Sequence, residues 1–386
     1  MNWSLDPNLP TSGIREILNQ ALARPGIIRL ETGEPNFSPP QHVLEAFIQA
    51  SQAGHNRYTA TEGIMLLRTA ISAKLHRVNH IQRSEYEILV TPGGIPGLFL
   101  AFMGVAKSGD EILVPDPGWP DYLGGLASLG IQAVPYALEA PQYKPDLDRM
   151  SALVTERTRA VVLNVPGNPT GRLLTKAETK ALCDWAVAHD LWIISDEVYD
   201  QIIFEGRAFS PAQWVPDRTL GVYSFSKTYA MTGWRLGYLT GPRFAIESLT
   251  RVAMGVWSSV SEPLQYAGAA ALTGPQDVVD RMCRAYQRRR DLSKHILDRF
   301  NIQTSHPDGA FYLLAYIGTA LSSRDFALRL LEEEGVAVAP GSAFGAQAEH
   351  WVRISLASSE EDLNEGLARL ARFAERMHGQ GQPRTL

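Results

Sequence analysis

The sequence predicts an α/β protein built on a mostly parallel β-sheet, followed by a smaller α+β unit. Three observations support this. Short β-rich segments alternate with helix-like segments through the middle of the chain. Several of these segments are continuous Val/Ile/Leu runs, typical of strands covered on both faces. The pattern then changes over the last hundred or so residues, where a long charged helix leads into shorter strands and helices.

The order of the elements supports this class, because strands that alternate with helices favour parallel pairing. The expected strands of the large sheet are Glu87–Val90, Glu111–Val114, Ala133–Tyr136, Ala160–Asn164, Leu191–Ser195 and Gly221–Phe225. Expected helices include Ile64–Arg77, Lys176–His189 and Val278–Phe300. The expected elements of the smaller unit are Gly309–Tyr316, Phe326–Glu334, Val336–Val338, Trp351–Ser355 and a final helix near Glu360–Met377.

One long uncharged stretch, Leu89–Ala106, raises the question of a membrane anchor. Pro92 and the Pro/Gly residues that follow it interrupt the stretch, and the remaining segment Leu98–Ala106 is too short to cross a bilayer. We expect a buried helix there. Residues Met1–Pro10 lack a basic segment followed by an apolar one, so no signal peptide is expected.

Composition excludes some classes of function. The 386 residues carry a net charge of -5, so no basic field favours nucleic acid or an acidic membrane. The two cysteines, Cys183 and Cys283, are far apart, which predicts neither a disulfide nor a metal site and favours a reducing, cytoplasmic location. We expect Arg288–Arg290 to form a solvated or interface helix face, and the tail Gly379–Leu386 to be frayed.

The strongest chemical signal is a lysine that follows an expected strand. Ser224–Lys227 places this lysine in a Ser/Gly-rich turn, and Arg235 follows eight residues later. A lysine amine can form a Schiff base with a carbonyl cofactor, and burial lowers its pKa so that the neutral amine becomes available. Taken alone, such a lysine is more often a surface residue.

Further motifs accompany the lysine in a fixed order. They are Gly33-Glu34-Pro35, Tyr58…Gly63…Leu67-Arg68, Thr91-Pro92-Gly93-Gly94, Pro117-Gly118-Trp119-Pro120-Asp121-Tyr122, Asn164-Val165-Pro166-Gly167-Asn168-Pro169-Thr170-Gly171, Ser195-Asp196-Glu197-Val198-Tyr199, Thr232-Gly233-Trp234-Arg235-Leu236-Gly237, Pro340-Gly341-Ser342-Ala343-Phe344 and Arg353-Ile354-Ser355. With them, the chain from about Ile27 to Arg372 resembles the aspartate aminotransferase family, the fold type I pyridoxal 5'-phosphate (PLP) enzymes of aminotransferase class I/II.

The resemblance implies a fold and a reaction. It implies a large PLP-binding domain at residues 45–285 and a small domain made of residues 1–44 and 286–386. It also implies ping-pong transfer of an amino group from an amino acid to a 2-oxo acid. Lys227, Asp196 and Tyr199 would be the catalytic residues. Asp196 ends an apolar strand, where open α/β sheets bind ligands, and its carboxylate can keep the cofactor's ring nitrogen protonated; the alternative is a helix cap or a turn residue.

Other residues would hold the cofactor. By resemblance, Tyr199 and Asn168 hydrogen-bond its phenolic oxygen, while Ser224 and Arg235 bind its phosphate. The implied phosphate site also includes the backbone N–H groups of Gly93, Gly94 and Ile95, which lie at an expected helix N-terminus. Trp119 would stack on the ring; the alternative for Trp119 is an ordinary core aromatic.

Two further roles concern the substrate and a second subunit. By resemblance, Arg353 grips the substrate α-carboxylate with help from Gly33 and Asn168; the alternative is a structural ion pair. Tyr58 would reach the phosphate of the neighbouring subunit, which implies a homodimer.

The chain departs from the family pattern at Ile95, where many relatives have a hydroxyl residue or a lysine. This departure removes one phosphate contact and makes a dicarboxylate substrate less expected. Phe344 and Ile14 would line the side-chain pocket, favouring neutral or aromatic substrates. Alternatives on the same scaffold are a PLP-dependent C–S lyase or cyclase, and a non-catalytic PLP-binding regulator, although no basic helix-turn-helix precedes this domain.

Overall fold

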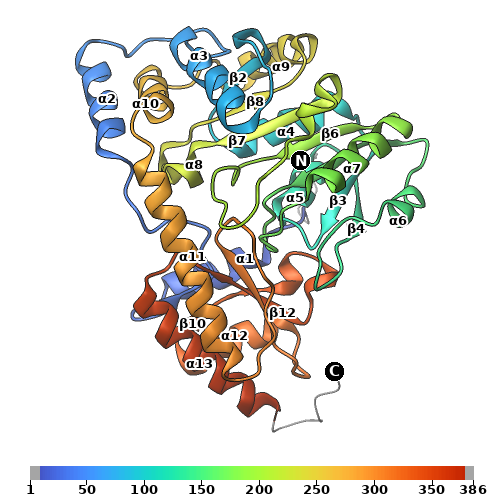
Figure 1. Cartoon of the computed structure of the whole chain (residues 1–386), viewed down its shortest axis with the longest axis vertical. Coiled ribbons are helices and arrows are strands. Elements are labelled where there is room, and N and C mark those ends of the chain that lie inside the picture. Colours follow the sequence, from blue (N-terminus) through green and yellow to red (C-terminus); the bar gives the residue numbers. More distant parts are fainter. Residues whose placement is uncertain (1–8, 379–386) are drawn as a thin grey trace, which may run out of the picture.

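The computed structural model describes residues 9–378, and its upper part in Figure 1 is a seven-stranded sheet flanked by helices. In spatial order the strands are β2 (Ile88–Thr91), β8 (Gly237–Thr240), β7 (Thr219–Ser224), β6 (Trp192–Asp196), β5 (Thr158–Asn164), β3 (Glu111–Asp116) and β4 (Gln132–Ala137). Strand β8 is antiparallel to both of its neighbours, and every other pair is parallel. The predicted mostly parallel sheet is confirmed.

All six predicted strands of this sheet are present, but β8 was not predicted. It has four residues and follows directly on the Thr232–Gly237 motif, so neither its length nor alternation marks it as a strand. The predicted end of β7 at Phe225 is wrong by one residue. Phe225 begins the short helix α8 (Phe225–Thr228), because the side chain of Ser224 accepts a hydrogen bond from the N–H of Ser226 and caps that helix.

The helices of the upper part are α2 (Gln41–Gln52), α3 (Met65–Lys74), α4 (Gly94–Val105), α5 (Asp121–Ser128), α6 (Leu147–Ser151), α7 (Lys176–Ala188), α9 (Arg243–Val256) and α10 (Glu262–Thr273). Helix α11 (Asp277–Asp298) begins there and leads to the lower part. Helix α7 begins with a capping box, in which Thr175 and Glu178 satisfy each other's backbone N–H groups.

Two predicted helices of the upper part differ from the structure by three or more residues at one end. Helix α3 ends at Lys74 and continues as a five-residue π-helix, Leu75–Asn79. Helix α4 begins at Gly94 rather than Leu98, because Pro96 lies in the first turn, where a missing N–H breaks no helical hydrogen bond. Across residues 9–378, every helix is either too short or too polar to span a membrane.

The lower part of Figure 1 holds the predicted α+β elements. The predicted elements are β9 (Tyr312–Tyr316), α12 (Ser323–Glu334), β10 (Val336–Ala337), β12 (Trp351–Ser355) and α13 (Glu360–His378). The sequence did not predict α1 (Gly13–Leu22), β1 (Ile28–Arg29) and β11 (Ala339–Pro340), which lie beside them. Strands β11, β12 and β9 form an antiparallel sheet, and β1 pairs with β10 in parallel. One apolar cluster joins these strands to α12 and α13. The predicted tail Gly379–Leu386 lies outside the described residues.

Helix α11 runs from the upper to the lower part of the molecule (Figure 1). The prediction of a solvated or interface face at Arg288–Arg290 is wrong for two of the three arginines. Arg289 is buried and donates to Asn36 Oδ1 and the carbonyl of Leu356. Arg290 is also buried and pairs with Glu205. Their side chains fill space between α11 and neighbouring loops, so only Arg288 faces solvent.

Candidate active site

A cavity of about 270 Å³ lies where the carboxyl ends of β5, β6 and β7 face β9 and β12. Open α/β sheets bind ligands at this edge. The predicted site residues that line the cavity are Gly33, Gly94, Ile95, Trp119, Asn168, Asp196, Tyr199, Ser224, Lys227, Arg235 and Arg353. The structure therefore brings together residues that are up to 320 positions apart in the sequence (from 33 to 353).

Lys227 presents its amine to the cavity from helix α8. Its Nζ donates to the carbonyl oxygen of Gly33 at 2.6 Å. Burial, reinforced by the positive charge of Arg353, lowers the pKa of Lys227 to about 8. The side chain therefore reaches the neutral, nucleophilic form far more easily than a surface lysine does.

Asp196 ends β6 and is buried opposite the lysine segment. Its Oδ2 accepts a hydrogen bond from the hydroxyl of Tyr122 at 2.5 Å, and burial raises its pKa to about 6. Its Oδ1 also accepts a hydrogen bond from the N–H of Val198 at 3.4 Å, within the turn that follows β6, and no helix of residues 9–378 begins there. The carboxyl group lines the cavity, where a ligand can reach it. Tyr122 lies within a recognised motif, but its contact with Asp196 joins residues 74 positions apart and could not be predicted from that motif.

Arg353 is a buried cation on β12, with 2 % of its surface exposed. Its Nη1 donates to Asn168 Oδ1 at 3.1 Å and its Nη2 donates to the carbonyl oxygen of Glu31 at 2.5 Å. Its Nε has no hydrogen-bond partner, and no carboxylate among residues 9–378 forms a salt bridge with it. The structural ion pair considered from the sequence is therefore absent there, and a buried cation of this kind fits an anionic ligand.

Tyr199 and Tyr312 form a buried pair beside the arginine. Their hydroxyl oxygens are 2.9 Å apart, and both residues line the cavity. The Arg353 guanidinium lies 4.2 Å from the centre of the Tyr312 ring. Tyr312 was not assigned a role from the sequence, because its neighbours Phe311 and Leu313 make it look like one more apolar strand position.

The start of helix α4 forms an anion cradle. Gly93 has a φ of 100°, which favours glycine, and a Cβ there would lie 2.5 Å from Arg235 Nη2. The first N–H groups of a helix lack helical partners, so those of Gly94 and Ile95 can bind an anion beside Arg235 and Ser224. Ser224 already caps α8 through its side chain.

The remaining predicted residues occupy different positions. Trp119 is half-buried on the cavity wall, and Ile14 also lines it. Phe344 does not line the cavity; it is buried against Arg353, 4.9 Å from the guanidinium. Its predicted place in the side-chain pocket is thus wrong. Tyr58 is 90 % exposed and lies outside the cavity of its own chain.

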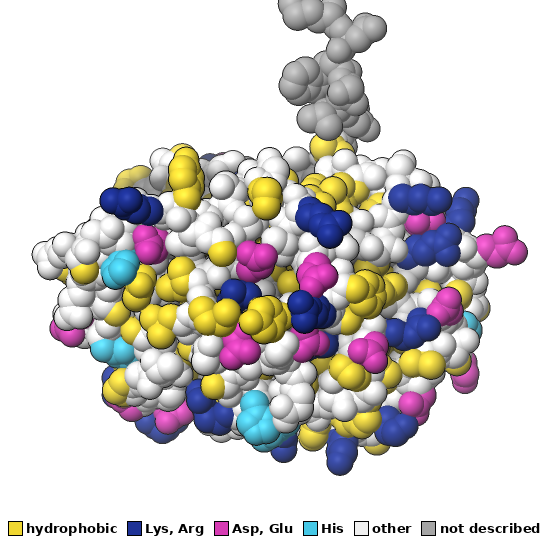
Figure 2. Space-filling model, turned by 90° about the horizontal axis from the view of Figure 1, so that it is seen from above, with side chains coloured by type: hydrophobic (Ala, Val, Ile, Leu, Met, Phe, Trp, Pro, Cys, Tyr) yellow, Lys and Arg dark blue, Asp and Glu magenta, His cyan; other side chains and the backbone are white. Residues whose placement is uncertain are grey.

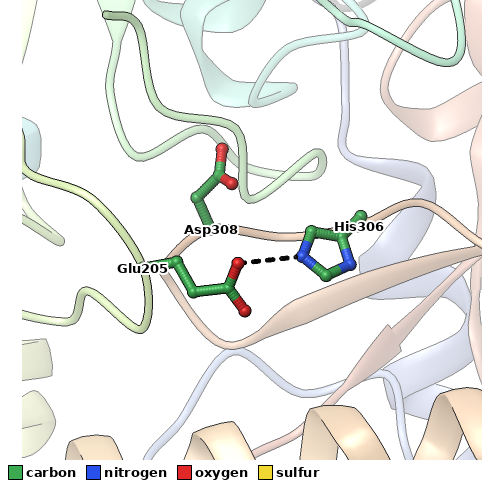
Figure 3. Close-up of side chains that lie close together, drawn as sticks. All are labelled: Glu205, His306 and Asp308. Carbon is green, nitrogen blue, oxygen red and sulfur yellow. Dashed lines mark hydrogen bonds and ion pairs between the residues drawn. The ribbon is translucent and has the colours of Figure 1, made fainter.

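A separate group of side chains resembles a metal site. The ligand atoms of Glu205, His306 and Asp308 lie within 4.8 Å of one another, and His306 Nε2 is 3.2 Å from Glu205 Oε2 (Figure 3). However, Arg290 pairs with Glu205 and Arg172 pairs with Asp308. Because arginines already neutralise both carboxylates, this exposed group is accounted for by ion pairs.

Comparison with known proteins identifies the class. The model of the family "Aminotransferase class I and II" matches residues 25–370. The chain belongs to this family, and it is an aminotransferase of fold type I. It is 36% identical to aromatic-amino-acid aminotransferase 2 of Thermococcus litoralis, over 93% of this chain and 94% of that protein.

Two further relatives support the same conclusion. The aspartate/prephenate aminotransferase of Thermus thermophilus is 37% identical over 92% of this chain and 93% of its own length. The solved structure of aspartate aminotransferase from Thermus thermophilus with maleate superposes with a TM-score of 0.91, at 36% identity, covering 96% of this chain and 100% of that one. The lyase, cyclase and regulator alternatives are not favoured.

The residues of the cavity fit the cofactor that this family uses. The glycine-lined cradle beside Arg235 suits a phosphate, because a side chain at Gly93 would fill it. The amine of Lys227 and the carboxyl group of Asp196 supply the two groups that an aldehyde-bearing pyridine needs. Arg353, whose Nε has no hydrogen-bond partner within residues 9–378, then remains for a substrate carboxylate.

Proposed function

We propose that the chain is a PLP-dependent aminotransferase in which Lys227 carries the cofactor as a Schiff base. The proposed donors are amino acids with neutral or aromatic side chains. Apolar residues Ile14, Ile95 and Leu98 on the cavity wall support this choice. Arg15 and Asp121 carry opposite charges on the same wall. The side-chain carboxylate of an acidic amino acid would therefore gain no net attraction there.

The chain's own residues perform the positioning and the proton transfer. When bound, PLP supplies an aldehyde for bonding to amines and a ring that accepts electrons. Arg353 holds the substrate α-carboxylate in a bidentate grip, so that the Cα–H bond lies near Lys227. Nζ of Lys227 would be released from its bond to the cofactor when the substrate's amino group takes its place. The freed, neutral Nζ takes the Cα proton and later returns it, as a general base and acid. Asp196 keeps a proton on the ring nitrogen. Amino acid and oxo acid use the same cavity in turn, so the kinetics should be ping-pong.

The observation that carries this proposal is the buried Arg353, which forms no salt bridge within residues 9–378 and faces the same cavity as the amine of Lys227. The test is a half-reaction screen of the PLP-loaded protein. Single amino acids are added without an oxo acid while the absorbance of the bound cofactor is recorded. Aromatic and neutral amino acids should bleach the absorbance most efficiently. A protein that no amino acid bleaches, or one that releases pyruvate and ammonia without an acceptor, would contradict an aminotransferase with this preference.

We also propose a homodimer in which Tyr58 completes the partner's phosphate site. Tyr58 is almost fully exposed, and Met65, Leu66, Met254 and Val256 are also exposed on or next to α3 and α9. Figure 2 shows hydrophobic side chains gathered among charged ones on the face that looks up in Figure 1, where these helices lie. Covering them would bury apolar surface. Mixing Y58A with K227A subunits should restore part of the activity that each variant lacks, because a mixed dimer contains one intact site.

The proposal also includes the division of the chain and its location. Residues 45–285 would form the PLP-binding domain, and residues 1–44 with 286–386 the small domain, with the division inside the continuous helix α11. We propose a cytoplasmic location, which the two free cysteines, Cys183 and Cys283, support.

A further inference from the structure

Tyr312 on β9 contacts two residues of the proposed active site at once. Its side chain is buried, with 1 % of its surface exposed. Its hydroxyl is 2.9 Å from that of Tyr199, and its ring lies under the guanidinium of Arg353. A Cβ at Gly33 would lie 2.6 Å from the Tyr312 hydroxyl oxygen, so the Gly33 backbone packs directly against this hydroxyl group.

The register of the small sheet explains the contact with the arginine. In the antiparallel pair β9–β12, Tyr312 lies opposite Ser355 and Leu314 lies opposite Arg353. Tyr312 and Arg353 are therefore diagonal neighbours on one face of the sheet, within reach of long side chains. A desolvated cation over an aromatic face is attracted to it. Since no carboxylate in residues 9–378 pairs with Arg353, the ring is a principal support of the guanidinium.

The hydroxyl pair has a preferred direction. Burial raises the pKa of both phenols, so both stay protonated. One of the two hydrogens lies between the oxygens, and the other is free. The positive charge of Arg353 lies over the Tyr312 ring and opposes the rise of the Tyr312 pKa more than that of the Tyr199 pKa. Tyr312 is therefore the stronger hydrogen-bond donor of the two. Tyr312 then donates to Tyr199, and the hydrogen of Tyr199 is free to point into the cavity.

We propose that Tyr312 is a positioning residue with two separable parts: its ring holds Arg353 in place, and its hydroxyl directs the hydrogen of Tyr199 into the cavity. The second part rests on the proposed function, in which Tyr199 donates to the phenolic oxygen of PLP. That hydrogen bond stabilises the deprotonated form of the bound cofactor, and so it sets the pH at which the cofactor's absorbance changes.

The test compares Y312F, which keeps the ring, with Y312L, which removes it. Tyr286→Phe is the matched control, because Tyr286 is buried in the same apolar cluster and its hydroxyl has no partner among the described residues. Three quantities are measured in the PLP-loaded proteins: the pH midpoint of the absorbance change, kcat and KM for one amino acid, and the affinity for 3-phenylpropanoate by calorimetry. This acid lacks an amino group and cannot react. Thermal melting compares the folding of all variants.

The two variants should differ in a defined way. In Y312F, Tyr199 no longer receives a hydrogen bond from Tyr312, which makes Tyr199 a weaker donor to the cofactor. Y312F should therefore raise the pH midpoint by about half a unit to one unit and lower kcat about 5- to 10-fold, while changing KM and the acid affinity less than about 2-fold. Y312L should show the same changes and also weaken binding of the acid about 10-fold. Tyr286→Phe should match the wild type in all three quantities.

The opposite results would overturn each part. An unchanged midpoint in Y312F contradicts the role of the hydroxyl, and equal acid affinities in Y312F and Y312L contradict the role of the ring. A wild-type protein that binds no PLP contradicts the proposed function instead. The acid affinities of the cofactor-free variants would still decide whether the ring supports Arg353.

Discussion

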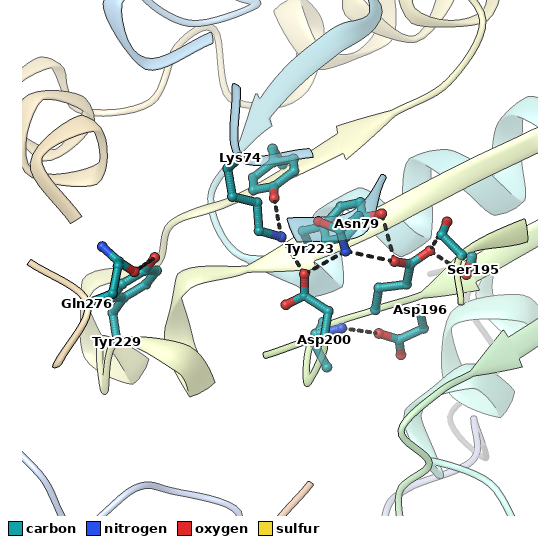
Figure 4. Close-up of polar contacts among 12 residues, drawn as sticks. Lys74, Asn79, Ser195, Asp196, Asp200, Tyr223, Tyr229 and Gln276 are labelled. Atoms are coloured by element: carbon teal, nitrogen blue, oxygen red, sulfur yellow. Dashed lines mark hydrogen bonds and ion pairs between the residues drawn. The ribbon is translucent and has the colours of Figure 1, made fainter. Parts of the chain in front are cut away.

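Two buried polar clusters meet at the end of strand β6, and they differ in how completely their charged groups are satisfied by neighbouring side chains. Asp196 and Glu197 are consecutive residues, and they enter different clusters. Asp196 lines the cavity, whereas Glu197 points into a network on the other side of the strand. Figure 4 shows Asp196 beside the residues of this network.

In the network, one pair of charges forms a salt bridge and the remaining carboxylate is surrounded by hydrogen-bond donors. Lys74 pairs with Asp200, and Asn79 donates to Asp200 at 2.9 Å. Glu197 accepts hydrogen bonds from the hydroxyls of Tyr223 at 2.8 Å, Ser210 at 2.6 Å and Ser195 at 2.9 Å. The Lys74 amine also lies 4.6 Å from the centre of the Tyr223 ring. Such a cluster fixes α3, β6 and β7 relative to one another and needs no ligand.

The cavity leaves its charges unpaired. Lys227, Asp196 and Arg353 are held by hydrogen bonds to neutral groups, and none of them forms a salt bridge with another residue in the range 9–378. Burying such groups is unfavourable unless a ligand completes them. Buried charged side chains that lack counter-ions and further hydrogen-bond partners therefore distinguish the cavity cluster from the structural network, more than burial or charge alone.

The largest expected effect is that of Lys227→Ala. Turnover should fall by about 10⁴-fold, since the variant loses both the cofactor bond and the proton-transferring amine. Steady-state transamination with an aromatic amino acid measures the loss. Lys180→Ala, which changes an exposed lysine of α7, is the control and should keep full activity. A Lys227→Ala protein with more than a few per cent of wild-type turnover would contradict the assignment.

Asp196→Asn should lower kcat by about 10²- to 10³-fold, because the ring nitrogen loses its charged partner. The same change should stabilise the cofactor-free protein. The pKa of Asp196 is raised from 3.8 to about 6, so in the wild type stability falls as pH rises from about 4 to 6 and stays reduced above pH 6. Asparagine does not ionise. Its advantage should be up to about 3 kcal/mol at pH 7.5 and should disappear near pH 4.

Chemical denaturation at several pH values measures this difference. An Asn variant that is less stable than the wild type at pH 7.5 would show that the Asp196 carboxylate stabilises the fold, as the carboxylates of the Lys74–Asp200–Glu197 network do.

Arg353→Gln should lower kcat/KM by about 10²-fold, mainly through KM, because the substrate carboxylate loses its charged partner. The melting temperature of the cofactor-free protein should stay equal or rise, since a buried charge without a counter-ion is removed. Steady-state kinetics and thermal melting test the two parts. A large fall in melting temperature would mean that Arg353 has a structural partner after all.

Asp200→Asn should have the smallest effect on activity and a clear effect on stability. It leaves Lys74 buried without a counter-charge, which should destabilise the fold by about 3 kcal/mol. We expect kcat to change less than about 3-fold in the folded protein. The double variant K74M/D200L should regain most of the stability, as apolar replacements of a buried pair often do. Failure to regain stability, with kcat lost as well, would remove the distinction between the two clusters.

The sequence predicted the large sheet and most of the cavity because these depend on local patterns. Apolar runs mark β3, β5 and β6, and short motifs mark Lys227, Asp196 and Arg353. The sequence did not predict Tyr122 or Tyr312 as site residues, because their roles depend on which distant side chain each hydroxyl meets. Phe344 was misplaced for a related reason: its motif was recognised, but which side of that segment faces the cavity depends on packing against Arg353.

The burial of Arg289 and Arg290 was also missed. A run of three arginines is usually solvated. Nothing nearby in the sequence indicates that Arg290 pairs with Glu205 or that Arg289 donates to the carbonyl oxygen of Leu356. Contacts between residues far apart in the chain decide such cases.

The most direct test of the central claim locates the cofactor. The PLP-loaded protein is reduced with borohydride, digested and analysed by peptide mass spectrometry. The mass of the reduced cofactor should appear on the peptide that contains Lys227, at that residue and in nearly all molecules. Attachment to Lys74 or to a surface lysine, with Lys227 unmodified, would contradict the claim that the unpaired cluster is the one a ligand completes.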